Sequence, residues 1–327
     1  MILNKNFLNS INLKVIILLL LILPANILFS QKFNKIILKE VLSIGSIDSE
    51  ILYQWADICT DDSGNIYLTD MMDYSIKKFT PEGEFIRKTG RSGQGPGEFN
   101  AIRFIKYYNN YLYVTDQYRP GIQVFDTNLQ YQHSIPFQKP IADIQILSHN
   151  RIAIPDVIEG NIQIIDSLGN KNEIFYYKKI QKKKNSDNLG FFPNMIEFEF
   201  DNQNNLYMCY TAKNEVKKCN NKGKTIWSVT FFKNKKQEYN NSYGLKTPEY
   251  FYYKDLALDT SMNIFILGGN LSKNKSRDVY VLSQNGEHIT TLTLPDETHC
   301  IYIDKENYLY SRAKQGVILK KYKMIYN

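Results

Sequence analysis

Short apolar stretches separated by polar turns recur along the chain, and they follow one pattern. The clearest copies are "DICTDDSGNIYLTD" (57–70), "EFEFDNQNNLYMCY" (197–210), "DLALDTSMNIFILG" (255–268) and "CIYIDKENYLYSRA" (300–313). Weaker copies are "RFIKYYNNYLYVTD" (103–116) and "DIQILSHNRIAIPD" (143–156). Each copy predicts a short apolar strand, a polar turn and a second strand rich in β-forming residues. The repetition indicates an all-β repeat protein.

A second recurring segment predicts two further strands after each copy, as in "SIKKFTPEGEFIRKTG" (75–90) and "DVYVLSQNGEHITTL" (278–292). The second strands are anchored, at spacings of 46, 40, 54, 58 and 45 residues, by Ile66, Leu112, Ile152, Leu206, Ile264 and Leu309. Six units of this length suit the four-stranded blades of a β-propeller. No window shows sustained helical periodicity, which disfavours the alternative of βα repeats.

The sixth unit ends with "VILKKYKMIYN" (317–327) and lacks its outer strand. Near the N-terminus, "ILKEVLSIGS" (37–46) resembles "GEFIRKTGRS" (83–92), with Gly45 matching Gly90. We therefore expect the N-terminal strand to pair in the last blade, which closes the ring and removes an exposed sheet edge. The predicted fold is an all-β, six-bladed β-propeller with four-stranded antiparallel blades.

The glycine-rich segment "GRSGQGPGEFN" (90–100) has the composition of a phosphate-binding loop. Such a loop needs a following helix whose N-terminus faces the anion. The β-type run "AIRFIKYY" (101–108) follows instead, so nucleotide binding is excluded. The segment predicts a crossing from the outer strand of one blade to the inner strand of the next, with Phe99 anchored between the blades.

Several motifs of the first unit match a known family. The corner reads Gly95-Pro96-Gly97-Glu98-Phe99, and the hairpin carries Asp61, Gly64-Asn65-Ile66-Tyr67-Leu68 and Asp70. These motifs resemble those of six-bladed β-propellers of the NHL-repeat type, particularly the exported bacterial ones. The resemblance begins near residue 33, runs to the end of the chain and is poorest in the third unit. It implies the fold but is nearly silent on function, because this scaffold carries binding modules, lyases and lactonase-like hydrolases alike.

The N-terminal segment predicts export. Basic residues precede the apolar run "VIILLLLIL" (15–23), and Ser30 supplies a small residue for cleavage. This pattern is typical of a secretory signal peptide over residues 1–30, and the run is shorter than the ~20 residues that span a bilayer. We expect residues 31–327 to form the propeller in the periplasm, at the cell surface or outside the cell, with no membrane span after cleavage.

The charge of the chain adds little to this picture. A net charge of +7 arises from 40 basic and 33 acidic residues, and much of the excess lies in Lys runs such as "KKIQKKKN" (178–185). A modest excess favours solubility and weak attraction to anionic surfaces, and we expect no nucleic-acid partner.

Export would place the cysteines in an oxidising compartment. The four are Cys59, Cys209, Cys219 and Cys300, without metal-ligand spacing. Cys59 and Cys300 fall in first strands of blades that ring closure makes neighbours. They either form a disulfide or stay unpaired in the core, and we favour unpaired thiols for all four.

The first positions of the predicted inner strands border the central channel. They hold Asp57, Arg103, Asp143, Glu197, Asp255 and Cys300, with His299 beside the last of them. One interpretation is a channel-mouth site for a ligand that carries positive charge or hydroxyls, or for a divalent cation such as calcium. The other is that these side chains cap the turns that lead into the strands and accept backbone N–H groups. The ligand-binding candidates are therefore Asp57, Arg103, Asp143, Glu197, Asp255 and His299.

A second set of acids opens the turns that follow the inner strands: Asp61, Asp201, Asp259 and Asp304. An isolated D-x-x-x-N predicts a turn that satisfies its own backbone, because it lacks the dense carboxylate spacing of a calcium loop.

The aromatic residues fall into two groups. One repeat position holds Tyr67, Tyr113, Tyr207, Phe265 and Tyr310, which predicts packing between blades. Outside that frame lie Tyr107, Tyr108, Tyr118 and "YFYY" (250–253). These form either a carbohydrate- or peptide-binding rim or a cluster that joins blades.

The leading functional hypothesis is a non-catalytic module that binds a ligand or a protein on one rim, with long loops at 178–195 and 232–253. A carbohydrate, a peptide or a cell-envelope protein would be its partner. The alternative is a metal-dependent lyase or lactonase-like hydrolase that uses the channel-mouth acids. No G-x-S-x-G or H-E-x-x-H motif supports a serine hydrolase or a zinc protease.

Overall fold

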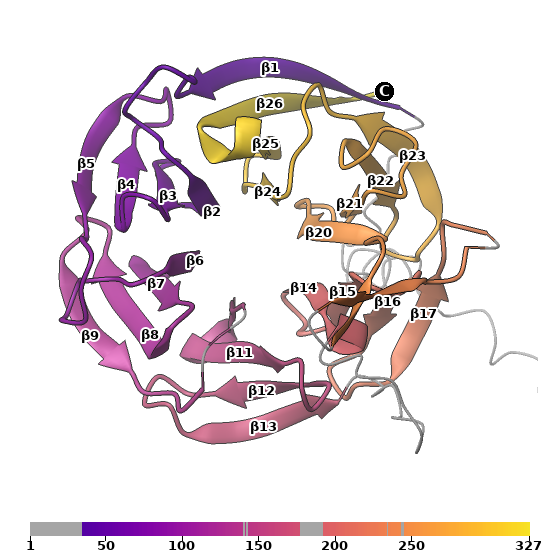
Figure 1. Ribbon diagram of the computed structural model, residues 1–327, viewed down its shortest axis with the longest axis horizontal. Helices are drawn as coiled ribbons and strands as arrows, with labels where there is room; N and C mark the ends of the chain where they lie inside the picture. The colour runs from indigo at the N-terminus through magenta and orange to yellow at the C-terminus, as the bar shows by residue number, and fades with distance from the viewer. Residues whose placement is uncertain (1–34, 140, 142, 177–191, 234, 243–244) are drawn as a thin grey trace, which may run out of the picture. The chain divides into compact units, whose positions relative to one another are not determined.

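Six four-stranded antiparallel sheets follow one another around a central channel, as the blades of a propeller (Figure 1). This computed structural model describes residues 35–139, 141, 143–176, 192–233, 235–242 and 245–327. The export signal predicted over residues 1–30 lies outside them. Within the described ranges, no helix has the length and apolar character needed to cross a membrane.

Blades one and two follow the predicted pattern of short strands joined by tight turns. Blade one consists of β2 (Trp55–Thr60), β3 (Ile66–Asp70), β4 (Ser75–Phe79) and β5 (Phe85–Thr89). Blade two consists of β6 (Ile102–Tyr108), β7 (Tyr111–Asp116), β8 (Arg119–Asp126) and β9 (Tyr131–Ile135). The first strand of each blade borders the channel and the last lies on the outside of the ring (Figure 1).

Blades three, four and five repeat this arrangement. Blade three consists of β10 (Gln145–Leu147), β11 (Arg151–Asp156), β12 (Asn161–Ile165) and β13 (Lys171–Tyr176). Blade four consists of β14 (Ile196–Phe200), β15 (Leu206–Tyr210), β16 (Val216–Cys219) and β17 (Thr225–Val229). Blade five consists of β20 (Tyr253–Leu258), β21 (Ile264–Gly268), β22 (Asp278–Leu282) and β23 (His288–Thr293).

Two features were not predicted from the sequence. A separate hairpin, β18 (Tyr239–Ser242) with β19 (Leu245–Pro248), lies in the long crossing between blades four and five. The described ranges also contain three short 3-10 helices: η1 (Ser148–Asn150), η2 (Phe192–Asn194) and η3 (Lys314–Gly316).

The ring closes as the sequence predicts. Blade six consists of β24 (Ile301–Ile303), β25 (Tyr308–Ala313), β26 (Ile318–Tyr326) and the N-terminal β1 (Ile36–Ile44). β1 pairs antiparallel with β26 from Ile36 opposite Tyr326 to Ile44 opposite Leu319. This pairing covers an edge that would otherwise expose unpaired backbone groups.

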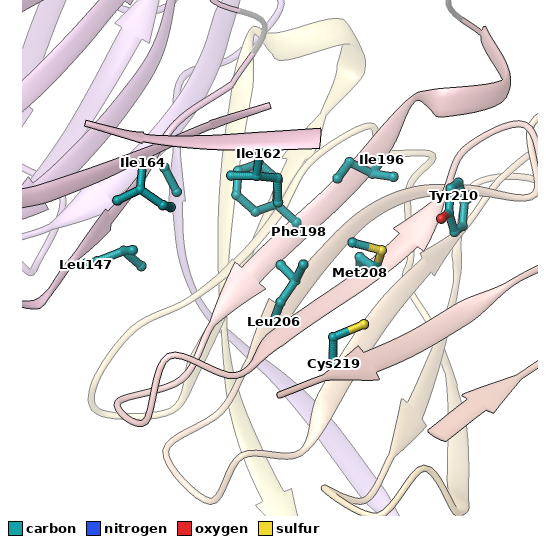
Figure 2. Close-up of a cluster of buried hydrophobic side chains, with 10 residues drawn as sticks. Leu147, Ile162, Ile164, Ile196, Phe198, Leu206, Met208, Tyr210 and Cys219 are labelled. Atoms are coloured by element: carbon teal, nitrogen blue, oxygen red, sulfur yellow. The ribbon is translucent and has the colours of Figure 1, made fainter. Parts of the chain in front are cut away.

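The core lies between neighbouring blades. Figure 2 shows the layer between blades three and four, where Ile162 and Ile164 pack against Phe198 and Met208. Each large apolar side chain buried in this way contributes roughly 1.5–3 kcal/mol relative to an exposed one. The repeated second-strand aromatics belong to such layers and are buried, at 0–4% exposure: Tyr67, Tyr113, Tyr207, Phe265 and Tyr310. The prediction that they pack as core is confirmed.

The glycine-rich corner turns between blades one and two, and its own side chains hold it. Glu98 accepts the Gly95 N–H at 2.8 Å and an Arg91 Nε–H at 2.7 Å. Gly97, at φ 75°, occupies the left-handed region that favours glycine. Phe99 is fully buried in the layer between the two blades, as predicted.

The turn aspartates close the far ends of the inner strands. In the first of these turns, Asp61 accepts the backbone N–H groups of Ser63 and Asn65, each at 2.9 Å. It also accepts the Asn65 amide and the Tyr67 hydroxyl, each at 2.8 Å. Asp201 and Asp304 repeat this pattern with Tyr207 and Tyr310. These acids satisfy their own turns, as the D-x-x-x-N pattern predicts for Asp61 and Asp201; in the turn of Asp304, Tyr308 takes the place of the asparagine.

Candidate functional site

A cavity of about 900 Å³ lies in the channel and is lined by residues from all six blades. Every candidate taken from the sequence lines it: Asp57, Arg103, Asp143, Glu197, Asp255 and His299. Cys300, the remaining first-position residue, lines it as well. The repeat frame therefore brings together residues from the starts of all six inner strands.

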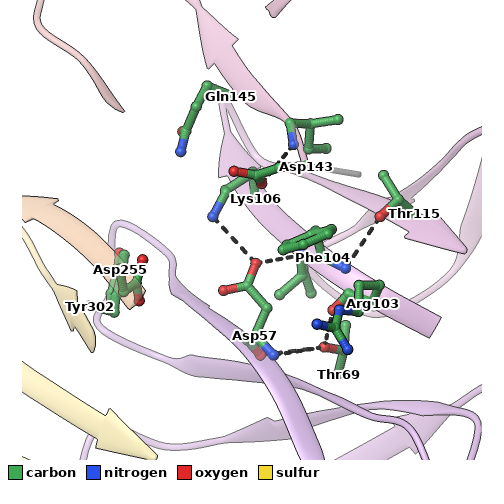
Figure 3. Close-up of polar contacts among 12 residues, drawn as sticks. Asp57, Thr69, Arg103, Phe104, Lys106, Thr115, Asp143, Gln145, Asp255 and Tyr302 are labelled. Atoms are coloured by element: carbon green, nitrogen blue, oxygen red, sulfur yellow. Dashed lines mark hydrogen bonds and ion pairs between the residues drawn. The ribbon is translucent and has the colours of Figure 1, made fainter. Parts of the chain in front are cut away.

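β-bulges at the starts of inner strands position several of these residues. In β2, Ala56 and Asp57 lie opposite the single residue Thr69, and β6 carries a matching bulge at Arg103 and Phe104. A bulge leaves an N–H without its ladder partner and redirects the side chains beside it. Threonine hydroxyls of the second strands fill the gap. The Asp57 N–H donates to Thr69 Oγ1 at 3.1 Å. In the next blade, the Phe104 N–H donates to Thr115 Oγ1 of β7 at 3.2 Å (Figure 3).

The carboxylates also join one blade to the next. Asp57 Oδ2 accepts the Ile105 N–H of blade two at 3.0 Å. In blade five, Asp255 Oδ2 accepts the Ile301 N–H of blade six at 2.7 Å, and Oδ1 accepts the Leu256 N–H at 2.8 Å. The interpretation that the channel-mouth acids accept backbone N–H groups is therefore correct for Asp57 and Asp255. It does not account for the carboxylate oxygens of Glu197, which accept no hydrogen bond from the described residues.

A lysine lies among the acids. Lys106 Nζ is 3.3 Å from Asp57 Oδ2 (Figure 3). Burial alone would lower the pKa of Lys106, but the surrounding carboxylates, Asp57 foremost, raise it well above its ordinary value. Lys106 is therefore a permanent internal cation that offsets part of the negative charge.

Sequence reasoning missed several polar lining residues, among them Lys106, Gln145 and Glu199. Gln145 Nε2 donates to Glu199 Oε1 at 2.9 Å and to the Phe198 carbonyl at 3.0 Å, which joins blades three and four. Strand alternation in "IEFEF" (196–200) would have placed Glu199 on the same face as Glu197. In β6 the bulge at Arg103 and Phe104 shifts the side-chain alternation by one residue. Alternation read from the sequence therefore did not place Lys106 in the channel.

Five of the carboxylates that line the cavity form what we call the acidic zone: Asp57, Asp143, Glu197, Glu199 and Asp255. The turn aspartates Asp201, Asp259 and Asp304 line the cavity as well. Burial raises the pKa of Asp143 to about 7, against the opposing effect of Lys106. Burial likewise raises the pKa of Asp255 to about 7 and that of Glu199 to about 8. Near neutral pH these groups therefore exchange protons readily.

Glu197 is the most open acceptor of the acidic zone. Burial, followed by repulsion from Asp255 and Asp143, raises its pKa well above the ordinary value. No residue that the structure describes forms a hydrogen bond or ion pair with its carboxylate. A carboxylate offers about four acceptor positions, so Glu197 can bind a donor supplied by a ligand.

A second group of lining residues forms the basic mouth: Arg103, Lys254, His299 and Arg312. Arg103 and His299 are exposed, whereas Asp57 and Asp143 are each only 8% exposed. The Lys254 ammonium donates to His299 Nδ1 at 3.0 Å. Burial, then the charges of Lys254 and Arg312, lower the pKa of His299, which favours the neutral ring that accepts this bond.

The donor set does not match a metal site. Within the described ranges, no three His, Cys, Asp or Glu side chains are placed to hold a metal ion. The backbone N–H bonds to Asp57 and Asp255 and the Lys106 ammonium already occupy several of the oxygens that a hard cation would need. The calcium hypothesis therefore gains no support from these residues.

The remaining candidates lie elsewhere or have structural contacts. Of the extra aromatics, Phe251 and Tyr253 line the cavity, whereas Tyr118 is 72% exposed on a loop.

All four cysteines are free thiols. Burial raises the pKa of the Cys59 and Cys300 thiols well above the ordinary value, so both are poor nucleophiles.

Comparisons with known proteins agree on the fold. A family model described as a 6-bladed beta-propeller matches residues 27–135. The chain is similar to a selenomethionine-substituted virginiamycin B lyase from Staphylococcus aureus, with a TM-score of 0.58 and 9% identity over 89% of this chain and 100% of that one. It is also similar to a streptogramin B lyase, with a TM-score of 0.55 and 10% identity over 90% of this chain and 100% of that one. A comparison with curated proteins finds no match. Identities this low establish the shared propeller architecture alone.

Proposed function

We propose that the protein is an exported, non-catalytic β-propeller that binds a small polar ligand in the channel cavity. The observation that carries this proposal is the Glu197 carboxylate, which faces the cavity without a bonding partner among the described residues. A cavity of about 900 Å³ is at the upper end of the usual size for small-molecule sites. A carboxylate kept in this setting is costly, which supports retention for a bound donor.

The site resembles binding sites in composition as well as size. Apolar surface from Phe104, Phe200 and Phe251 lies beside the acids and the basic mouth. Apolar walls with a few convergent polar groups are typical of ligand pockets. A carbohydrate or a peptide supplies the hydroxyls or charges that such groups bind, and a cell-envelope protein could reach the basic mouth.

A pocket-filling variant tests this function. Ala56 lines the cavity, so Ala56→Trp should obstruct it, while Ile226→Trp places the same ring on the exposed outer strand of blade four. A low-molecular-mass filtrate of the native cells should raise the melting temperature of the wild type and of Ile226→Trp, but not of Ala56→Trp. An equal response in all three proteins, or no response in the wild type, would overturn the proposal.

A lyase-type or lactonase-type enzyme is the second candidate, favoured by the pKa of about 7 for Asp143 and Asp255. Acids in this range serve as general acid–base groups. One of the similar structures is a streptogramin B lyase, so incubation with a streptogramin B tests this candidate. Turnover by the wild type that is lost in Asp143→Asn would establish it. A melting temperature unchanged by calcium would count against its metal-dependent form.

We also propose that the repeats are of the NHL type and that the chain is exported. Support for the first comes from the Gly95–Phe99 corner. In it the Gly95 N–H donates to Glu98, and Phe99 is buried between the blades, as the motif predicts. N-terminal sequencing of the protein from its native envelope tests the second. We expect the mature chain to begin at Gln31, and an intact Met1 would contradict export by signal cleavage.

A further inference from the structure

Groups of both charges line the cavity. In the acidic zone Asp57 and Asp143 are each 8% exposed, whereas Glu197 is half-buried. The basic mouth includes the exposed Arg103 and the half-buried Lys254 and Arg312. A ligand in the cavity therefore meets both carboxylates and cationic side chains.

The acidic zone offers acceptors that no protein group uses. Both oxygens of Glu197 lack a hydrogen bond to the described residues, and Asp143 uses only Oδ1, for the Ile144 N–H at 2.7 Å. A primary ammonium carries three donors and no acceptor. It would therefore suit a site where open carboxylate oxygens converge. A hydroxyl donates only one hydrogen and would leave most of these oxygens unsatisfied.

The basic mouth has the complementary property. Among the described residues, none forms an ion pair with Arg103, Lys254 or Arg312. The Arg103 guanidinium contacts Met71 Sδ at 3.5 Å and lies 5.6 Å from the Phe104 ring centre, and neither contact neutralises its charge. A planar guanidinium in this state suits a carboxylate, which it can bind through two parallel hydrogen bonds.

We propose that the cavity binds a zwitterion, with its ammonium group at Glu197 and its carboxylate at Arg103. This inference rests on the proposed small-ligand function and names the chemical class of that ligand. A zwitterion adds one charge to each region and leaves the net charge of the cavity unchanged. A simple amine satisfies only the acidic zone, and a simple carboxylate satisfies only the basic mouth.

Three probes with the same six-carbon chain separate the two ends: 6-aminohexanoate, hexylamine and hexanoate. Isothermal titration calorimetry on the full mature chain should give 6-aminohexanoate an affinity at least about tenfold higher than either single-charge probe, since each lost charge-assisted contact costs that much or more. Triglycine carries the same two charges across peptide bonds. Tighter binding of triglycine identifies a peptide source of the zwitterion, and tighter binding of 6-aminohexanoate identifies an aliphatic one.

Two substitutions assign the ends. Glu197→Gln should weaken 6-aminohexanoate and hexylamine at least about tenfold and leave hexanoate unchanged. Arg103→Gln should weaken 6-aminohexanoate and hexanoate and leave hexylamine unchanged. Arg87→Gln, on the outer strand of blade one, is the matched control and should change none of them. Melting temperatures verify that each variant is folded.

The outcomes separate this inference from the function on which it rests. Equal affinities for 6-aminohexanoate and hexylamine, or the absence of any effect of Arg103→Gln, would overturn the proposal that the ligand is a zwitterion. The proposal of a ligand-binding cavity would still stand. The same holds if no probe binds although the native filtrate stabilises the wild type but not Ala56→Trp. If neither the probes nor the filtrate acts through the cavity, both proposals fail.

Discussion

Two sets of carboxylates lie at opposite ends of the inner strands, and their surroundings differ. The turn aspartates, such as Asp61, have their oxygens filled by backbone, amide and hydroxyl donors of the same hairpin. The acids of the acidic zone, most of which lie at or near the starts of the inner strands, keep open oxygens, most clearly at Glu197. Both sets consist of carboxylates. Saturation by local donors is what distinguishes an acid that holds the fold from one that is available to a ligand.

The two sets also differ in what they contribute to stability. A turn aspartate such as Asp61 replaces water with fixed donors, which stabilises the native chain. The acids of the zone are buried near one another, with Lys106 as an internal counter-ion. Burial raises the pKa of Asp143, Glu199 and Asp255, so the ionisation of these three acids opposes folding. Removing their charge and removing a turn aspartate such as Asp61 should therefore change stability in opposite directions.

The largest effect is expected at the turns. Asp61→Ala leaves the Tyr67 hydroxyl and two backbone N–H groups without their acceptor, and we expect a loss of about 4 kcal/mol in the free energy of unfolding. Asp166, in an exposed turn of blade three, accepts the same kinds of donor from Leu168 and Asn170. Asp166→Ala should cost clearly less by urea denaturation. Equal losses would show that burial of the turn is unimportant.

The internal cation gives the next largest effect. Lys106→Met removes the counter-ion of the acidic zone, and we expect a loss on the order of 3 kcal/mol at pH 9, where Asp143, Asp255 and Glu199 are ionised. The loss should shrink at pH 5.5, where Asp143 and Asp255 are protonated. Lys78, which donates to the Thr127 carbonyl, supplies the control Lys78→Met, whose effect should not depend on pH. A pH-independent loss in Lys106→Met would contradict its role.

The pH dependence of wild-type stability follows from the same groups. The folded-state pKa values of Asp143 and Asp255 are about 7, above their unfolded values, so the folded chain binds more protons between about pH 4 and 7. The resulting stability is complete below the unfolded pKa and is lost as pH rises through 7, and through about 8 for Glu199. These acids border an open cavity, which limits the effect to about 2 kcal/mol between pH 5.5 and 9. The groups that face them are Asp57, Lys106, Arg103, Glu197, Gln145, Cys300 and Tyr302. A free energy of unfolding that rises over this range would contradict the arrangement.

The smallest effect is a gain. Asp143→Asn keeps an oxygen for the Ile144 N–H and removes a buried charge that repels Asp57. We expect about 1 kcal/mol of added stability at pH 9 and almost none at pH 5.5, where the native side chain is already neutral. Chemical denaturation at both values measures the difference. A loss of stability at pH 9 would place Asp143 with the turn aspartates.

Much of the fold was predictable because each unit repeats the same pattern of strands and turns. The match between Gly45 and Gly90 predicted that β1 completes blade six, and the β1–β26 pairing confirms it. The hairpin β18–β19 was not predicted, because its polar segment in the long crossing lacks the apolar alternation of the blades. Local pattern carries little information where packing against the ring is slight.

The candidate site was predictable in position but not in chemistry. Equivalent repeat positions brought Asp57, Glu197 and Asp255 to one cavity. The contribution of Lys106 depends on the bulge in β6, which residue types did not reveal. Whether an acid keeps open oxygens depends on N–H groups from the next blade, such as Ile105, and these are remote in sequence.

Glu197→Gln offers the most direct test of the difference between the two sets of acids. The free energy of unfolding and the affinity for 6-aminohexanoate should be measured on the same preparation at pH 7. We expect stability equal to or above that of the wild type and an affinity at least about tenfold lower. A destabilised variant that binds the probe as tightly as the wild type would show that Glu197 serves the fold, as the turn aspartates do.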